Sequence, residues 1–418
     1  MFVCYRACRI MFACFAVMAA ASGVVAEDLS LQQALDIAIK NNPTVAAGRL
    51  SADAAKQSAK GANALTNPEI LVAPSIVGDA GSDSALLFSQ PLEINGSRRV
   101  RGQIASSEAT AVGYDSDTTR REILLRVNQS YWDVARAQEL VKLNQENITY
   151  LETVRAAVQK QYDVGTAPGA QVLKMDVELA RARQELSQAQ LGLQQSMAEL
   201  NTLMACPTNN VFSVSEPLIF NDVCIDCAGL LTSALARRPE IASACAQYTS
   251  AQAQIKAAKL LRVPDLALQA RRESFDNDSD NGVAIAINLP LLDWGSARAE
   301  ERRARLAARS REKQVEAVRN NISLDIEQAV QRVNTASQVV REYQGGVLTT
   351  SEELATMARK GFEKGASSYL EVLEAQRTLR SVRSDYYSAL AEHAKALAQL
   401  EWASGCAVSQ MKTLEANK

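Results

Sequence analysis

The sequence predicts a mainly α-helical protein with a small β part, in which one structural unit is written twice. Three observations lead to this fold class. Aromatic residues make up 5% of the chain and there are only ten prolines, as is usual in helix-rich proteins. Short runs of alternating apolar and polar residues occur in two pairs. The proline and glycine landmarks around these runs recur about 200 residues further along the chain.

The first 26 residues have the pattern of a secretory signal peptide. Arg6 and Arg9 precede an apolar run over 10–21, and small residues end at Ala26, after which we expect cleavage. The apolar run is too short for a membrane-spanning helix. Cys14 raises the alternative of a lipid-modified N-terminus, but the residues before it are a poor lipidation signal, so we favour cleavage without a lipid.

The charge of the chain argues against nucleic acid as a partner. Without residues 1–26, which hold two arginines and no acidic residue, 43 basic and 47 acidic residues remain, a net charge of −4. The arginine-rich stretch 298–311 is interleaved with glutamate, and we interpret it as a solvated helix face. No stretch after residue 26 approaches about 18 uninterrupted apolar residues, so the sequence predicts no transmembrane helix.

The duplication rests on landmarks that recur in the same order. Three of them pair as Pro43 with Pro239, Pro91 with Pro290, and Gly165 with Gly365. Their offsets are 196, 199 and 200 residues, which is nearly constant. Chance similarity between alanine-rich helices would not carry prolines and glycines along in order, so we infer two repeats.

Each repeat is predicted to run helix, hairpin, very long helix, turn, long helix. Ser30 can cap the first helix, which we expect to break at Asn42-Pro43. The first repeat (27–228) is expected to hold strands 68–77 and 84–92, long helices 97–161 and 168–204, and a further segment 205–228. The second repeat (229–418) is expected to hold strands 264–274 and 282–291, long helices 296–361 and 367–404, and a C-terminal tail. Residues 1–26 stand apart as the signal peptide.

The hairpins and long helices are supported by local patterns. Alternation is clearest in 282–291, and prolines stand at strand ends, where a missing hydrogen-bond donor is tolerated. Ser97 and Ser296 are candidate N-caps of the long outgoing helices. The returning helices keep a seven-residue repeat with one row of mostly small residues, which is coiled-coil patterning. An outgoing helix of roughly 65 residues would be on the order of 95 Å long.

The four predicted strands pose a physical problem. Strands of about ten residues match the length that crosses an outer membrane as a tilted barrel. Four strands cannot close a barrel, and open sheet edges are not tolerated in lipid. Several chains must therefore contribute four strands each: a dimer would give eight strands and a trimer twelve.

Several motifs carry a resemblance to a known family. They are residues 90–99 (QPLEINGSRR), the turns at 162–165 and 362–365, and the stretch 371–375 (EVLEA). In this order they resemble the TolC-type outer-membrane efflux factor family, over essentially all of the chain after residue 26. The first motif is most similar to the heavy-metal efflux (CzcC-like and CusC-like) branch, although Asn95 and Ser97 depart from its usual sequence.

The resemblance implies a homotrimer with a 12-strand outer-membrane barrel continued by a periplasmic α-helical barrel. An equatorial belt is implied as well, for which the equatorial segment 205–228 and the C-terminal tail are the candidates. It also implies two partners: an inner-membrane efflux transporter and a periplasmic adaptor, or membrane fusion protein. The trimer would be embedded in outer-membrane lipid and would conduct substrate passively to the exterior. Heavy-metal cations, drugs and other compounds all remain open as substrates.

Candidate functional residues follow from the same resemblance. The turns are expected to be adaptor-docking tips, formed by Val164, Gly165, Thr166, Lys364, Gly365 and Ala366. Glu371 and Glu374 lie one helical turn apart, and we expect them to form a pore constriction of carboxylate rings. Ser367 stands where the best-known members have a basic residue that helps to hold this aperture shut. Each of these positions also has an ordinary structural reading, as a helix-ending glycine or an exposed acidic residue.

We expect no cofactor, no metal site and no enzymatic activity, because the sequence has no nucleophile elbow, phosphate loop or zinc signature. His393 is expected to pack in a helix seam. Cys224 and Cys227 have redox or metal spacing but lack a second ligand pair, so a disulfide or inert thiols are favoured. The alternative function is a secreted coiled-coil structural or adhesion protein. That reading explains the heptads but not two equivalent hairpins bounded by proline.

Overall fold

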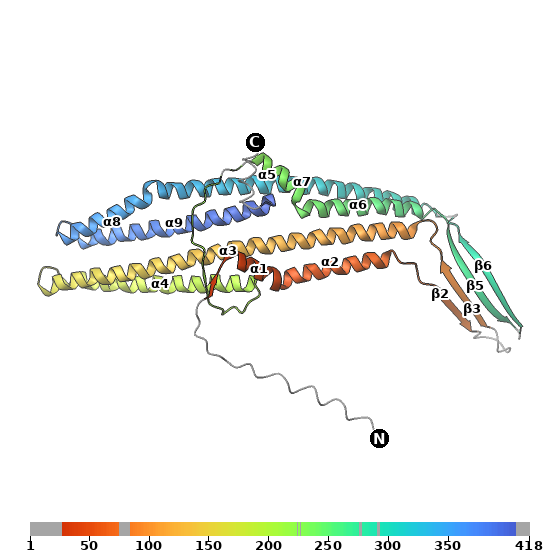
Figure 1. The fold of residues 1–418 in the computed structure, drawn as a ribbon, viewed down its shortest axis with the longest axis horizontal. Coiled ribbons are helices and arrows are strands. Elements are labelled where there is room, and N and C mark those ends of the chain that lie inside the picture. The colour runs from red at the N-terminus through yellow and green to blue at the C-terminus, as the bar shows by residue number, and fades with distance from the viewer. Residues whose placement is uncertain are drawn as a thin grey trace, which may run out of the picture.

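The computed structural model describes residues 27–74, 84–223, 225, 227–275, 278–290 and 293–406. The predicted signal peptide, the tips of both hairpins and the tail beyond 406 lie outside the described residues. The molecule is long and thin, with a sheet at one end and helices running along its length to two turns at the other end (Figure 1).

The two repeats share an order of two short helices, two strands, a long outgoing helix and a long returning helix. The first comprises β1 (Glu27–Leu29), α1 (Leu31–Asn41), α2 (Pro43–Ala62), β2 (Glu69–Pro74), β3 (Ser84–Pro91), α3 (Ser97–Asp163), α4 (Gly169–Leu203) and β4 (Phe212–Val214). The second comprises α5 (Cys227–Arg237), α6 (Pro239–Leu260), β5 (Asp265–Phe275), β6 (Asp278–Asn288), α7 (Ser296–Glu342), a π-helical segment (Tyr343–Val347), α8 (Leu348–Glu363) and α9 (Tyr369–Ser404). β1 and β4 form a separate parallel pair near the middle of the molecule.

The break between α1 and α2 follows from local chemistry. Ser30 caps the start of α1, as predicted from the sequence, and forms a capping box with Gln33. Asn42 then caps α2, accepting a hydrogen bond from the Thr44 N–H, and Pro43 occupies the first helical position, where its missing N–H costs nothing. The Asn42 side chain also donates to the Leu203 carbonyl at 2.7 Å, which ties this joint to the end of α4.

The predicted caps of the two longest helices were wrong. Gly96 and Gly295, and not Ser97 and Ser296, occupy the N-cap positions of α3 and α7, with φ of 85° and 87°. No side chain caps either helix from these positions. The Asn95 side chain instead accepts a hydrogen bond from the Ser97 N–H at 3.0 Å. The glycines allow the left-handed backbone with which the chain turns from the sheet into each helix.

Two predicted boundaries also differ from the structure. The single helix expected over 296–361 is interrupted at Tyr343–Val347, where Gly346 has a φ of 155°. α3 has no such interruption over its 67 residues. Strand β6 runs from Asp278 to Asn288 and not over 282–291, because the polar residues before 282 pair with β5 out to Phe275.

The four longer strands form one antiparallel sheet in the order β2-β3-β5-β6. The strand register separates the side chains into two faces. One face is mostly apolar and carries Ile70, Val72, Leu86, Phe88, Leu266, Leu268, Val283, Ile285 and Ile287, with Gln90, Arg272 and Asn281 among its polar members. The opposite face is mostly polar or small and carries Glu69, Ala73, Ser89, Gln269, Arg271, Glu273, Ala284 and Ala286, together with Leu71 and Leu87. β2 and β6 each present one edge that pairs with no described strand.

The core reflects the duplication. Near the middle of the molecule, one cluster gathers Ala34, Ala38, Tyr131, Leu200 and Phe212, and a second gathers Leu230, Ala234, Ile326, Leu400 and Cys406. A third cluster lies closer to the turns and includes Val158, Met175 and Tyr369. Among the described residues, none of the helices combines the length and the apolar character needed to cross a membrane.

Candidate functional site

The two helix-connecting turns lie side by side at the end of the molecule farthest from the sheet (Figure 1). In the α3–α4 turn, Gly165 has a φ of +77° and its N–H donates to the Tyr162 carbonyl at 2.9 Å. The Thr166 N–H donates to the Gln161 carbonyl at 2.9 Å. These two bonds make a Schellman motif, which ends a helix and requires the left-handed conformation that glycine adopts most easily.

The α8–α9 turn repeats this geometry. Gly365 has a φ of +73° and donates to the Phe362 carbonyl at 3.0 Å, and Ala366 donates to the Gly361 carbonyl at 2.8 Å. Ser367 packs directly on the end of α8: a Cβ added to Gly361 would lie 2.3 Å from its Oγ. Ser367 therefore serves helix packing at the position where the resemblance led us to look for a basic residue.

The residues of both turns are open to solvent. Val164 is 73% exposed although it is apolar, and Thr166, Lys364 and Ala366 are also exposed. A Cβ added to either turn glycine would meet no atom within 4 Å. The two turns thus present a joint surface that a partner could reach. Whether one binds there stays a prediction.

Glu371 and Glu374 are exposed side chains near the start of α9. The Ser368 hydroxyl caps this helix by accepting a hydrogen bond from the Glu371 N–H at 3.3 Å. A carboxylate in the first turn is also favourable to the helix dipole, so Glu371 has a structural role in addition to any role in a pore. The assignment of both residues to a constriction stays a prediction.

Ion pairs that the sequence analysis missed join the two repeats just beyond the turns. Glu178 on α4 pairs with Arg377 on α9 at 2.6 Å, and one heptad further on Glu185 pairs with Arg380. The hydrogen bond to Glu178 raises the pKa of Arg377. The partners lie almost 200 residues apart in sequence. The seven-residue spacing of the two glutamates is the signal that could have indicated a shared helix face.

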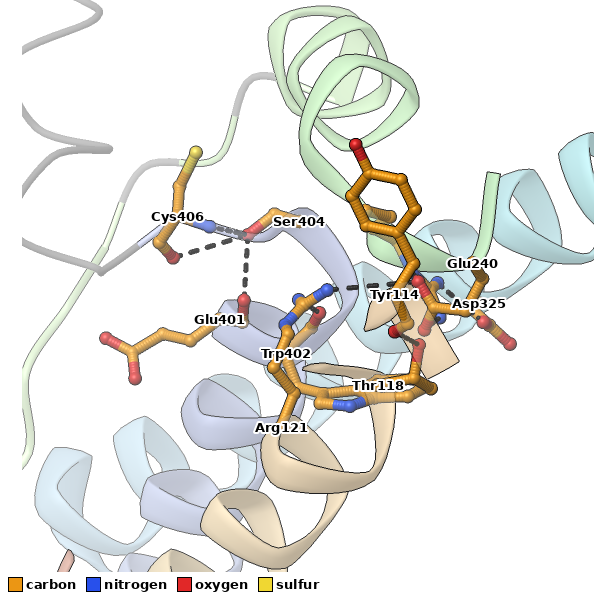
Figure 2. A network of polar contacts seen from close by, with 10 residues as sticks. Tyr114, Thr118, Arg121, Glu240, Asp325, Glu401, Trp402, Ser404 and Cys406 are labelled. Carbon is orange, nitrogen blue, oxygen red and sulfur yellow. Dashed lines mark hydrogen bonds and ion pairs between the residues drawn. The ribbon is translucent and has the colours of Figure 1, made fainter. Parts of the chain in front are cut away.

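A second missed cluster holds the middle of the molecule together (Figure 2). Arg238, at the joint between α5 and α6, donates to Asp325 at 2.8 Å and to Glu240 at 2.9 Å. Its guanidinium also lies 4.5 Å from the centre of the Trp402 ring. Burial opposes the charged form, but these two carboxylates outweigh burial and raise the pKa of Arg238. Arg121 on α3 joins the cluster by donating to the Trp402 carbonyl at 2.5 Å.

His393 lies in the helix seam, as predicted, with only 1% of its surface exposed. Its ring packs against Phe220 with centroids 4.9 Å apart, and its Nε2 has no hydrogen-bond partner. Burial lowers the pKa of His393, against the influence of Asp222. Cys206, Cys227, Cys245 and Cys406 are free thiols, whereas Cys224 lies outside the described residues. Within the described part of the chain, no three His, Cys, Asp or Glu residues are grouped as metal ligands would be.

A membrane-length sheet with one apolar face, joined to long paired helices that end in exposed turns, defines the class of outer-membrane efflux channels. The chain belongs to the outer membrane efflux protein family, whose description matches residues 34–205 and 230–406. This confirms the family resemblance. It also sets aside the alternative of an unrelated secreted coiled-coil protein.

Individual relatives agree with this assignment. The chain is 26% identical over 375 residues to the cobalt-zinc-cadmium resistance protein CzcC of Cupriavidus metallidurans, covering 87% of each chain. It is 25% identical to the toluene efflux pump outer membrane protein TtgC of Pseudomonas putida, covering 86% of this chain and 73% of the relative. Among solved structures, CusC superposes with a TM-score of 0.77 at 18% identity, covering 91% of this chain and 93% of CusC. VceC of Vibrio cholerae superposes with a TM-score of 0.75 at 19% identity, covering 90% and 96%.

These findings place the chain in the outer membrane, with a large periplasmic extension. The sheet is at one end of this extension and the turns are at the other. The structural likenesses bear on the fold alone, because their sequence identities are low.

Proposed function

We propose that this chain forms, as a homotrimer, the exit duct of a tripartite efflux pump. The observation that carries the proposal is the four-stranded sheet, which has one mostly apolar face, one mostly polar or small face and two edges that pair with no described strand. Unpaired backbone groups are costly in lipid, so the edges must find partners. If β6 of one copy pairs with β2 of the next, three copies close a 12-strand barrel with its apolar face towards lipid and its polar face towards the lumen.

The dimensions support a membrane-spanning barrel. β5 and β6 have 11 residues each. At roughly 3.3 Å per residue such a strand is about 36 Å long, and a tilt of about 45° reduces its height to about 26 Å. This matches the apolar band of an outer-membrane barrel. α3, with 67 residues, would extend about 100 Å away from the membrane.

The turns would then lie deep in the periplasm, where partners are available. We propose that the surface formed by Val164–Thr166 and Lys364–Ala366 docks a periplasmic adaptor, which connects the duct to an inner-membrane transporter. The support is the open, solvent-exposed geometry of both turns. The duct needs no catalytic residue, because it conducts what the transporter loads.

We propose divalent heavy-metal cations as the transported substrates. The relative CzcC is by its name a cobalt-zinc-cadmium resistance protein, and Glu371 and Glu374 would place acidic side chains at the periplasmic entrance. Three copies would give two rings of three carboxylates, because the first repeat has Gln171 and Lys174 at the equivalent positions. Such rings favour cations over anions.

The test is to purify the protein from outer-membrane fractions in mild detergent and to measure its mass. A trimer is expected, and its reconstitution into planar bilayers should give ion-conducting pores. Cells that depend on this channel should become sensitive to cobalt, zinc or cadmium salts when it is deleted. A stable monomer, or a protein recovered only from the soluble periplasm, would contradict the proposal.

A further inference from the structure

The junction between the sheet and the helices carries a concentration of positive charge. We call this region the junction collar and define it as residues 60–68, 92–101, 256–264 and 293–309. The ends of α2 and α6 and the starts of α3 and α7 meet there, directly beside the strands (Figure 1). The collar holds twelve basic and four acidic residues, a surplus of eight positive charges in a chain whose net charge is −2.

Most of this charge is not neutralised within the chain. Four collar cations are in ion pairs: Arg101 with Glu93, Arg262 and Arg305 with Glu301, and Arg303 with Glu300. The other eight are exposed and form no ion pair with any described residue: Lys60, Arg98, Arg99, Lys256, Lys259, Arg298, Arg302 and Arg309.

Helix stability alone does not account for these positions. α3 and α7 both begin with arginines and have no acidic residue in the first turn. Positive charge at a helix N-terminus opposes the helix dipole and is unfavourable by a few tenths of a kcal/mol or more. The same arrangement occurs in both repeats, at Arg98 and at Arg298. At α7, Asp293 offsets part of this charge, because its carboxylate accepts a hydrogen bond from the Gly295 N–H at 3.0 Å, and this bond together with Arg298 lowers its pKa. The remaining positive charge at both helix starts is complementary to a negatively charged group outside the chain.

Exposed apolar side chains lie at the same level as the charges. Trp294 is 91% exposed and has a φ of +49°, an uncommon backbone conformation for a bulky residue. Leu65, Ile94 and Leu261 are 60%, 64% and 54% exposed. An apolar surface with an exposed tryptophan, next to unpaired arginines, is the combination that suits the boundary between acyl chains and headgroups.

We propose that the junction collar binds the acidic phospholipid headgroups of the periplasmic leaflet of the outer membrane. The arginines contact lipid phosphates, and Trp294 lies at the level of the headgroups. This inference rests on the proposed function, in which the sheet spans the membrane, because only then is the collar at the membrane surface. Strands β2, β3 and β5 begin or end directly at the collar, and the collar's positive charge is complementary to an anionic lipid.

The three tryptophans of the chain make this testable. Trp132 and Trp402 are partly buried near the middle of the molecule, and Trp132 lies about 50 Å along α3 from the sheet. Trp294 is therefore the one described tryptophan that brominated lipids in a bilayer can quench. The full-length protein is reconstituted in phosphatidylethanolamine vesicles with either brominated phosphatidylglycerol or brominated phosphatidylcholine at equal mole fraction. The variant Trp294→Phe gives the fluorescence of Trp132 and Trp402 alone, which is subtracted to obtain that of Trp294.

The brominated phosphatidylglycerol should quench Trp294 several-fold more strongly, since each arginine near a lipid surface is worth about a fivefold preference for anionic lipid. Salt should reduce the difference. In a variant without four of the collar arginines, the two brominated lipids should quench Trp294 equally. Its substitutions are Arg98→Gln, Arg99→Gln, Arg298→Gln and Arg302→Gln. A control variant removes the same charge from exposed sites away from the collar, with Lys160→Gln, Lys174→Gln, Arg319→Gln and Arg332→Gln. It should keep the stronger quenching of Trp294 by brominated phosphatidylglycerol.

Two results would overturn the inference while leaving the proposed function intact. One is a protein that inserts into vesicles but shows no quenching of Trp294. The other is equal quenching by the two lipids in the unmodified protein. Failure of the protein to insert into vesicles at all would instead contradict the membrane-spanning sheet, and with it both proposals.

Discussion

A single substitution at a turn should separate adaptor docking from folding. We expect Gly365→Asp to abolish efflux while the protein stays folded and assembled. A Cβ at Gly365 meets no atom within 4 Å, so the substitution creates no clash. Its φ of +73° is one that aspartate tolerates better than most residues. The backbone term is about 1 kcal/mol, and a carboxylate at a helix C-terminus adds about 0.3–1 kcal/mol.

A loss of about 1–2 kcal/mol is small against the roughly 5–15 kcal/mol by which folded domains are stable. The new charge, however, would lie in the middle of the exposed surface that we propose for docking. The assay is growth on cobalt, zinc or cadmium salts of cells that depend on this channel, together with sizing of the purified protein. Binding of the adaptor is measured by cross-linking at the turn.

Gly405→Asp is the matched control. Gly405 ends α9 with a φ of +69°, so the same backbone and dipole terms apply, but it lies in the middle of the molecule, next to Arg121 and Arg237. We expect this variant to keep full efflux. Normal growth with Gly365→Asp, or equal loss of growth with both variants, would refute the assignment of the turns as docking tips.

Three further predictions concern other sites. Glu371→Gln combined with Glu374→Gln should lower the cation preference of pores in planar bilayers; unchanged ion preference would mean that these residues do not face the lumen. Arg238→Met should lower the stability of the detergent-solubilised protein by about 3 kcal/mol in thermal unfolding, because it removes the cation shared by two part-buried carboxylates and leaves Glu240 only the longer pair with Arg121 at 3.9 Å; a wild-type melting temperature would show that the cluster contributes little. Burial lowers the pKa of His393 below 6.5, so the unfolded chain takes up a proton more readily than the folded one, and stability should be full above pH 6.5 and decline below it. His393→Leu, which introduces the residue of the first repeat, should flatten this pH dependence of the melting temperature, and an unchanged profile would exclude His393 as its cause.

The fold could be predicted largely from local signals. Proline and glycine landmarks revealed the duplication, and the sequence around Asn42 predicted a helix break that the structure confirms in detail. The π-helical interruption was missed even though Gly345 and Gly346 lie inside the predicted helix, where paired glycines weaken a helix. The N-caps of α3 and α7 were missed because both helices start at a Gly-Ser pair. The sequence alone does not show whether the glycine or the serine of such a pair is the N-cap.

The interactions between the repeats could not be predicted, for a physical reason. Arg238 finds Asp325 and Trp402 across 87 and 164 residues of sequence, and no local pattern specifies which helices pack against each other. The exposure of the turn residues was, by contrast, implied by their place between two long helices. The function of the turns and of the acidic residues stays a prediction, since it depends on copies and partners beyond the single chain.

The interruption at Tyr343–Val347 gives the two halves of the chain different mechanical properties. α3 is an unbroken rod, whereas the helix at the equivalent place in the second repeat has a joint formed by a residue without a side chain, Gly346. In the proposed trimer, three copies of the continuous helix α3 would alternate around the tube with three copies of the interrupted helix α7–α8. A force that widens the end formed by the turns would then bend only the three α7–α8 helices. The opening would therefore keep threefold symmetry, even though the wall is built from six similar repeats.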